Sequence, residues 1–359
     1  MSELFSPLTF NHGPSMKNRF MLAPLTNCQS GVDGVLSDDE FHWLTLRARG
    51  GFGLTMTCAA HVQRIGQGFP GQLGIWSDKH LPGLTRLAQE IKAHGSVAIC
   101  QLHHAGMRSP AELIGEAPVC PSANERAGAR GLSLEETEQL IEDFIAGAVR
   151  AQQAGFDGVE LHGAHGYILC QYFSASINHR TDRFGGSLEN RFRILFDIIE
   201  GVRARCSSDF IVGVRLSPER FGMQLPEVLQ IAQQCLLDER LDFLDMSLWD
   251  VFKEPEDSAY SGKTLLQHFA ALERGSVRLG VAGNIRTPEQ AEEALAENID
   301  WIMLGRAAIL NHDFPAQYQE DPAFVPAAIP VTRAHLRNEG LSDGFIEYFG
   351  GNWPENLAD

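Results

Sequence analysis

Two histidines and a tyrosine stand close together in the segment His162-Gly-Ala-His165-Gly-Tyr167. They follow an apolar run at 157–161 that predicts a buried strand. Two imidazole N–H groups spaced three residues apart can converge on one oxygen atom, and a phenol nearby can give up a proton. The combination indicates a site that polarises a carbonyl or nitro group and protonates what results.

The two histidines could instead bind a metal ion through their i, i+3 spacing, but a third ligand is then needed. The nearest carboxylate is Glu160, which strand alternation is expected to place on the helix-facing side. The seven cysteines are scattered, with no two within five residues of each other, which argues against a zinc or iron–sulfur site. We therefore expect no metal, and the single cysteines suggest a reducing cytoplasm.

Short apolar runs alternate with helical stretches along the chain. The predicted strands are 20–23, 54–57, 97–102, 158–161, 211–216, 243–246, 278–281 and 301–304, and the predicted helices are 38–49, 79–94, 134–154, 189–205, 226–239, 263–274 and 288–297. Eight strands with helices between them predict an α/β fold, a single parallel (β/α)8 TIM barrel. We expect one domain over 1–359, in which 103–132 is an excursion over the barrel mouth and 320–359 is a C-terminal extension without an assigned role.

Barrel enzymes build their sites at the C-terminal ends of the strands. In this sequence polar or glycine residues follow nearly every apolar run. They include Pro24, Leu25, Thr26, Ala59, Gln101, His162, His165, Arg215, Ser247, Trp249, Gly283, Asn284, Gly305 and Arg306. Together they suggest one large, mostly uncharged ligand with an anionic end.

The anionic end is expected at the last two strands, which end in Gly283-Asn284 and Gly305-Arg306. Glycine lets backbone N–H groups approach a phosphate in these barrel loops, and Arg306 can add a charge-assisted hydrogen bond. The alternative is that the glycines only make turns and Arg306 is a surface cation.

Composition excludes several classes of partner. The 29 Lys and Arg residues against 46 Asp and Glu give a net charge of −17 in 359 residues. Such a charge repels nucleic acid and anionic membrane surfaces. We also find no apolar run of about 18 residues and no signal peptide, so neither a membrane span nor export is expected.

The sequence resembles the old yellow enzymes, which are FMN-dependent NAD(P)H oxidoreductases. The resemblance covers roughly residues 1–320. It is carried by Pro24-Leu25-Thr26, by Gln101, by His162-x-x-His165-x-Tyr167, by Gly305-Arg306 and above all by the run Arg180-x-Asp182-x-x-Gly-Gly-Ser-Leu-Glu-Asn-Arg191. We expect the charges of that run to form a salt-bridged loop leading into a helix.

The resemblance implies a role for each site residue. Thr26 would contact the O4 edge of the flavin, Gln101 its pyrimidine portion, and Arg215 the region of N1 and C2=O. Pro24, Leu25 and Ala59 would line the ring, and Gly283, Asn284, Gly305 and Arg306 would hold the phosphate. His162 and His165 would hold the substrate oxygen, and Tyr167 would donate the proton.

The implied reaction is the reduction of an activated alkene, with NADPH or NADH as a transient reductant. Activated alkenes, quinones and phenolic inhibitors are the expected small-molecule partners, and a homo-oligomer is possible. Two other functions stay open: a flavin-binding protein without catalysis, and a phosphate-binding barrel aldolase or isomerase. The latter needs a lysine at a strand end, and none of the five lysines terminates a predicted strand.

Overall fold

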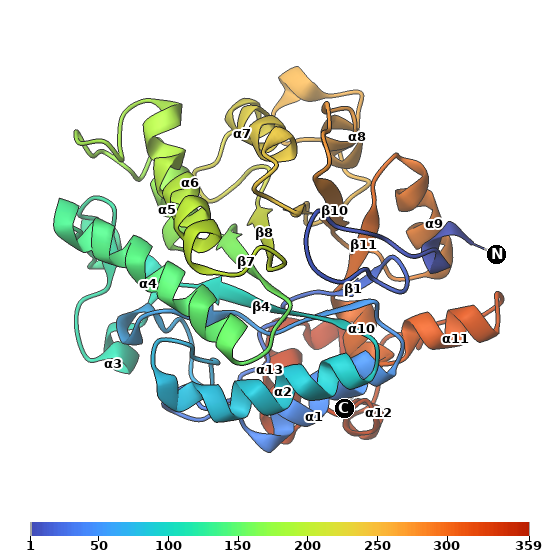
Figure 1. Ribbon diagram of the computed structural model, residues 1–359. Helices are drawn as coiled ribbons and strands as arrows, with labels where there is room; N and C mark the ends of the chain where they lie inside the picture. Colours follow the sequence, from blue (N-terminus) through green and yellow to red (C-terminus); the bar gives the residue numbers. More distant parts are fainter. Residues whose placement is uncertain (1, 359) are drawn as a thin grey trace.

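Eight parallel strands close into a barrel with helices around it in the computed structural model, which describes residues 2–358 (Figure 1). The barrel closes because β2 pairs with both β1 and β4. In chain order the barrel strands are β1 (Phe20–Leu22), β2 (Leu54–Met56), β4 (Val97–His103), β7 (Gly158–Gly163), β8 (Ile211–Leu216), β9 (Phe243–Ser247), β10 (Arg278–Ala282) and β11 (Trp301–Leu304). The predicted (β/α)8 barrel is confirmed, with each strand within two residues of its expected ends.

The helices that follow the strands form the outer layer seen in Figure 1. They are α1 (Asp38–Arg49), α2 (Leu81–Ala93), α4 (Leu134–Gln153), α6 (Leu188–Arg205), α7 (Leu225–Leu237), α8 (Leu265–Ala270), α9 (Pro288–Ala296) and α10 (Arg306–Leu310). The helix expected over 263–274 is shorter than predicted: Thr264 caps its first turn in a capping box with Gln267, and the helix ends at Ala270. Helix α10 follows Gly305 directly and was not predicted.

Aromatic side chains fill the barrel interior at the N-terminal ends of the strands. Phe243 and Trp301 are fully buried there with ring centroids 5.4 Å apart, and Phe10 from the N-terminal loop packs against both. Two strand glycines make the room: a Cβ at Gly213 would lie 2.0 Å from the Phe243 ring, and one at Gly280 would lie 2.1 Å from the Trp301 indole. The barrel is thus a packed core with no pore at this end.

The long connection after β4 holds several short elements. They are the 3-10 helices η4 (Gly106–Arg108) and η5 (Glu125–Ala127), the helix α3 (Ala111–Ile114) and a two-stranded parallel ribbon of β5 (Val119–Cys120) and β6 (Arg130–Gly131). This segment packs against α5 (Ile168–Phe173) and reaches the barrel mouth through Arg108, whose guanidinium lies 4.7 Å from the centre of the Tyr167 ring. Its irregular structure is as expected.

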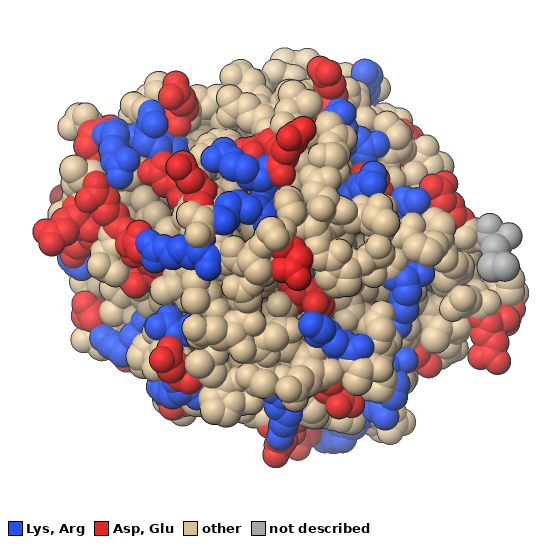
Figure 2. Space-filling model, in the orientation of Figure 1, with Lys and Arg blue, Asp and Glu red and all other residues tan. Residues whose placement is uncertain are grey.

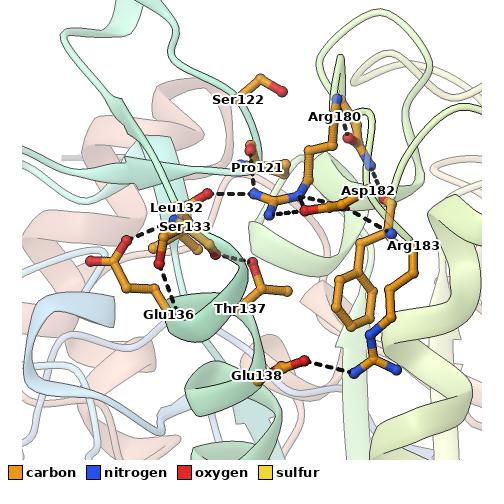
Figure 3. Close-up of polar contacts among 12 residues, drawn as sticks. Pro121, Ser122, Leu132, Ser133, Glu136, Thr137, Glu138, Arg180, Asp182 and Arg183 are labelled. Carbon is orange, nitrogen blue, oxygen red and sulfur yellow. Dashed lines mark hydrogen bonds and ion pairs between the residues drawn. The ribbon is translucent and has the colours of Figure 1, made fainter.

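The charged run at 180–191 is a salt-bridged loop that leads into α6, as predicted. Arg180 pairs with Asp182 and donates to the backbone carbonyls of Pro121 and Leu132, so it ties this loop to the excursion after β4 (Figure 3). At the other end of the run, Arg191 pairs with Glu227 of α7. The run is therefore a structural clamp between three segments of the chain.

The chain after the barrel forms three more helices and a final turn. They are α11 (Phe314–Glu320), α12 (Arg333–Asn338), α13 (Asp343–Asn352) and the 3-10 helix η7 (Pro354–Asn356). Shorter elements elsewhere are η1 (Glu3–Phe5), β3 (Ala60–His61), η2 (Arg64–Gly66), η3 (Asp78–His80) and η6 (Ser258–Tyr260). The C-terminal segment folds back onto α1, where Trp43 and Phe345 meet edge to face with ring centroids 5.4 Å apart.

Acidic and basic side chains alternate over the face shown in Figure 2, without a large area of one sign. Many of them form exposed ion pairs, such as Arg86–Asp38 and Arg205–Glu142. Within residues 2–358 no helix is both long and apolar enough to span a membrane.

Candidate active site

A cavity of about 670 Å³ lies at the C-terminal ends of the barrel strands. All thirteen residues that were expected to have a role in the site line this cavity. Its walls also hold residues that were not assigned to the site. These are Ala23, Phe69, Ser247, Trp249, Ala282, Ile285, Arg286, Met303, Tyr348, Asn352 and Trp353.

The two histidines face each other at one wall of the cavity. His162 lies near the end of β7, and the chain then turns so that His165 adopts a left-handed backbone with φ of 60°. This costly conformation is held by a hydrogen bond from the His165 N–H to the Ser217 hydroxyl, at 2.9 Å. His162 Nε2 and His165 Nδ1 lie 2.9 Å apart and share one hydrogen bond, so an oxygen in the cavity can accept from both rings only when it replaces that bond.

Both imidazoles are expected to be neutral near pH 7, because the pKa of each is lowered. Burial, reinforced by the positive charges of Arg215 and Arg108, lowers the pKa of His165 to about 3. Burial and the neighbouring His165 hold the pKa of His162 well below its ordinary value. The pair therefore acts as neutral hydrogen-bonding groups.

A hydroxyl behind His165 selects which of its nitrogens bears hydrogen. Ser247 Oγ lies 2.8 Å from His165 Nε2 and 3.4 Å from Arg215 Nη2. An arginine can only donate, so Ser247 accepts from Arg215 and its own proton is free to go to His165 Nε2. This arrangement leaves the hydrogen of His165 on Nδ1, the nitrogen that faces His162.

Tyr167 stands immediately before α5, with its ring packed among the imidazoles. Its ring centre lies 4.3 Å from that of His103 and 5.0 Å from that of His162, both edge to face. His103 is itself fixed by Gln72, whose Nε2 lies 3.0 Å from His103 Nδ1. With Arg108 on the ring as well, the phenol is held in one position at the cavity wall.

The floor of the cavity contains a buried cluster of charged and amide groups. Gln101 Nε2 donates to Glu160 Oε1 at 2.6 Å, and Arg215 Nε lies 3.1 Å from Asp245 Oδ2. Our expectation that Glu160 faces the helices was wrong: residues 160 and 162 share one face of β7, and that face is the barrel interior. Burial raises the pKa of both carboxyls, and the charge of Asp245 raises that of Glu160 further.

The far end of the cavity is positively charged. Arg306 Nη2 and Arg286 Nε both donate to the side-chain oxygen of Asn284, at 3.1 and 2.9 Å. Asn284 is held in turn by Asp250, 3.1 Å from its amide nitrogen. Because both arginines donate to one amide oxygen, two cations lie close together here. Partial burial and the nearby charge of Arg286 lower the pKa of Arg306. A bound anion would relieve that repulsion.

These residues fit a flat ring system with a phosphate at one end. Gln101 is fully buried, and its Oε1 has no hydrogen-bond partner within the protein although it borders the cavity. An unpaired buried acceptor of this kind is costly unless a ligand donates to it. The ring N–H of a flavin is such a donor, and the cationic end suits its phosphate.

Three lining residues come from the C-terminal extension, for which no role was predicted. Tyr348 and Asn352 belong to α13, and Trp353 follows it. Arg333 and Arg337 of the same segment pair with Glu347 and Asp343 and do not line the cavity. Arg286 was also missed, although an arginine two residues after Gly283-Asn284 was a usable signal for the anionic end.

The chain is similar to known flavin oxidoreductases. Residues 3–323 match the model of the NADH:flavin oxidoreductase / NADH oxidase family. The chain is 35% identical over 328 residues to the probable NADH-dependent flavin oxidoreductase YqiG of Bacillus subtilis, covering 88% of each chain. It is 34% identical to an NADPH dehydrogenase of Bacillus pumilus, over 89% of this chain and 95% of that one.

The chain is also similar to part of a longer enzyme and to a solved structure. An NADH:fumarate oxidoreductase of Klebsiella pneumoniae is 34% identical over 88% of this chain, which spans only 36% of that longer protein. Among solved structures, the old yellow enzyme homologue from Zymomonas mobilis superposes with a TM-score of 0.80 at 28% identity, over 96% of this chain and 99% of that one. The chain thus belongs to the old yellow enzyme family and is a flavin oxidoreductase that uses FMN and NAD(P)H.

Proposed function

We propose that the protein reduces the activated C=C bond of α,β-unsaturated carbonyl or nitro compounds, with quinones as further acceptors. The observation that carries this proposal is the meeting of His162, His165 and Tyr167 at one wall of a cavity whose far end is cationic. A bound FMN supplies the hydride, and NADPH or NADH restores it.

The substrate oxygen is bound between the two histidines. Without substrate, His162 Nε2 and His165 Nδ1 share one hydrogen bond, so only one of them carries the hydrogen. When a carbonyl or nitro oxygen replaces that bond, with hydrogen on both nitrogens, both rings donate to the oxygen and withdraw electron density from the double bond. The same hydrogen bonds strengthen as negative charge develops on that oxygen, so they stabilise the transition state more than the ground state.

Tyr167 delivers the proton to the α-carbon. Its fixed ring makes the phenol a general acid that needs little reorganisation, and Arg108 over the ring favours the charge left behind after transfer. The neutral histidines cannot replace it easily, because the low pKa of His165 leaves it without a spare proton near pH 7.

The remaining cavity residues hold the cofactor. Pro24, Leu25 and Ala59 line the ring system, and Gln101 and Thr26 bind its polar edge. Arg215 offers positive charge where a reduced flavin gathers negative charge. The phosphate is bound by Arg306 and Asn284 together with the backbone of Gly283 and Gly305, and Arg286, which was not predicted, adds a second guanidinium.

The two other functions have less support. No lysine lines the cavity among the described residues, so a Schiff-base aldolase or isomerase lacks its nucleophile. A flavin-binding protein without catalysis would have no use for the aligned histidines and tyrosine. The free cysteines support a reducing cytoplasm as the place of action. We propose that the whole chain forms one FMN-binding domain.

The test is spectroscopic. The purified protein should be yellow with one FMN per chain, should bleach anaerobically with NADPH or NADH, and should recover its colour when 2-cyclohexenone is added. Reoxidation by oxygen but by no enone, nitroalkene or quinone would contradict the proposed reaction and favour the flavin-binding alternative.

A further inference from the structure

Helix α1 begins with the sequence of a capping box, but the acidic side chain of that box points elsewhere. The Ser37 hydroxyl accepts from the Glu40 N–H at 3.0 Å, as expected for a first turn. In α4 the equivalent pair forms the box in both directions, because Glu136 also accepts from the Ser133 N–H. The carboxyl of Glu40 instead turns into the protein, where it is completely buried.

The buried carboxyl of Glu40 joins the chain after β1 to the chain after β2. Asn27 Nδ2 donates to Glu40 Oε1 at 3.0 Å, and the Ser30 hydroxyl donates to Oε2. The thiol of Cys58, in the segment that follows β2, hydrogen-bonds the same carboxyl. Three donors around one carboxyl fit its ionised form, which can only accept.

Burying this carboxyl is costly for the fold. Burial raises the pKa of Glu40, and the three hydrogen bonds oppose that rise. All three donors are neutral, and no cation among the described residues pairs with the carboxyl to offset its charge. Departures of this kind from stable packing are expected where a residue serves a functional site.

The residues next to these donors line the cavity. Thr26 precedes Asn27 and borders the cavity, and Ala59 follows Cys58 and borders it as well. Asn27 and Cys58 are completely buried and do not line it. Glu40 therefore holds the cavity wall at the ends of β1 and β2 from behind.

The loop after Thr26 depends on this support. Cys28 has a left-handed backbone with φ of 55°, which is unfavourable for a residue other than glycine. The Asn27 side-chain oxygen closes the turn by accepting from the Gln29 N–H at 3.0 Å. The amide of Asn27 is thus used at both ends, and its orientation depends on Glu40 as the acceptor for its nitrogen.

We propose that Glu40 is a positioning residue for the flavin, because it fixes Asn27 and thereby the Thr26 hydroxyl at the O4 edge of the ring. The inference rests on the proposed contact between Thr26 and the flavin. A hydroxyl that donates to O4 stabilises the electron-rich reduced ring, so a displaced Thr26 should lower the reduction potential. The negative charge of Glu40 has a separate effect, since its removal should favour the reduced ring and raise the potential.

The experiment measures the reduction potential of the FMN holoenzyme by anaerobic titration against a reference dye. Glu40→Met removes both the acceptor and the charge. Glu40→Gln removes the charge but keeps an oxygen for Asn27, while the Ser30 hydroxyl can accept from the new amide. Both changes are also made in Thr26→Val protein. FMN content and thermal midpoint are recorded for each variant.

The matched control is Glu136→Met. Glu136 has the same place in the first turn of α4 as Glu40 has in α1, but its side chain is 41% exposed and does not line the cavity. The control therefore shows what the loss of an acidic group from a helix start does by itself.

Glu40→Met should shift the equilibrium of the flavin about threefold to tenfold toward the oxidised form, the size of one hydrogen bond and about 15–30 mV for a two-electron couple. Neither Glu40→Gln nor the control should lower the potential, and Glu40→Met should not lower it further in Thr26→Val protein. An unchanged potential in Glu40→Met, equal shifts in the two Glu40 variants, or an equal fall in both Thr26 backgrounds would overturn the proposal.

A second variant decides the question if Glu40→Met does not fold or does not retain FMN. Glu40→Asp keeps the charge, but its side chain is shorter by a methylene group and cannot hold Asn27 in the same place. It should lower the potential as well. A wild-type potential in Glu40→Asp would then overturn the proposal.

The outcomes also separate this inference from the proposed function. If Thr26→Val alone leaves the potential unchanged, the proposed contact of Thr26 with the flavin is wrong and the inference is overturned with it. If Thr26→Val lowers the potential and Glu40→Met does not, only the inference is overturned. Wild-type enzyme that no enone reoxidises would refute the proposed reaction, while the potentials would still decide the role of Glu40.

Discussion

The charged loop at 180–191 and the cavity both hold arginines, yet they use them differently. In the loop, Arg180 is saturated: it pairs with Asp182 and donates to two backbone carbonyls (Figure 3). In the cavity, Arg306 and Arg286 both donate to one neutral amide oxygen and repel each other.

The same contrast extends to uncharged groups. Gln101 Oε1 and His162 Nδ1 in the cavity have no partner within the protein, although both are buried. Buried polar groups in a stable fold are nearly always hydrogen-bonded, so groups left without partners at a cavity indicate a ligand. In this protein, the paired charges of the loop stabilise the fold, whereas the unpaired groups of the residues that line the cavity are available to a ligand.

The largest effect should come from Tyr167→Phe, which removes one hydroxyl from the cavity and leaves the ring in place. Reoxidation of the reduced enzyme by an enone should slow by about 10²- to 10⁴-fold, because a general acid is lost. Reduction by NADPH needs no phenol proton and should change little. Stopped-flow measurement of the two half-reactions decides, and equal slowing of both would remove Tyr167 from the role of proton donor.

Arg180→Met should destabilise the fold without touching the cofactor. The change leaves the Pro121 and Leu132 carbonyls and Asp182 without their partner, and should lower the free energy of unfolding by about 2–4 kcal/mol. Chemical denaturation measures the loss. The affinity for FMN should remain at the wild-type value. A large fall in that affinity would contradict a purely structural role of Arg180.

Arg306→Ala should have the opposite signature. Loss of a charge-assisted bond to the phosphate should weaken FMN binding by about 10- to 100-fold, read by fluorescence titration of the apoprotein. Stability of the apoprotein should hold or improve, because crowding with Arg286 is relieved. Arg183→Ala, which removes an exposed ion-pairing arginine of the loop, is the control. Equal FMN affinity in both variants would place Arg306 outside the phosphate site.

Ser247→Ala tests a positioning residue that acts through His165. Without the serine hydroxyl, hydrogen is no longer directed to His165 Nδ1, and phenols should bind about threefold to tenfold more weakly. Ser247→Thr keeps the hydroxyl and should restore affinity, which a merely structural role of the small side chain would not explain. Binding that is weakened equally by alanine and threonine would rule out the tautomer argument.

The smallest effect concerns pH and the buried carboxyl of Glu160. Its folded pKa lies above the unfolded value of about 4.3, so it contributes stability at low pH that is lost as the pH rises through the folded pKa. Glu160→Gln removes this titration while keeping a partner for Gln101. The thermal midpoint of the apoprotein should therefore fall less between pH 5 and pH 9 in the variant. Parallel curves for the two proteins would count against a protonated Glu160.

Much of the barrel could be predicted from sequence because its strands are short apolar runs with clear ends. The residues following those runs necessarily meet at one mouth, so the expected site residues all reach the cavity. Even so, the error over Glu160 was avoidable, since side chains alternate along a strand and residue 160 must share the face of His162.

The presence of Tyr348, Asn352 and Trp353 at the cavity could not be predicted in the same way. Helix α13 contains three glycines, Gly344, Gly350 and Gly351, which lower its intrinsic helix propensity. Its position depends on contacts with residues some 300 positions earlier, such as the bond between Ser342 and Gln29. Neither periodicity nor local motifs carry that information. The hydrogen bond between Ser247 and His165 could not be predicted either, because it forms only when the chain after β7 and the end of β9 meet in the folded barrel.

The packing of Phe10, Phe243 and Trp301 inside the barrel has a consequence for how ligands reach the cavity. Because aromatic rings fill the N-terminal end of the barrel, ligands reach the cavity from the C-terminal end, where its lining residues lie. Under the proposed reaction, NAD(P)H and the acceptor use the same cavity in turn, so an excess of either should inhibit the enzyme. The glycines that admit Phe243 and Trp301 thus help to set the order of events at the opposite end of the barrel.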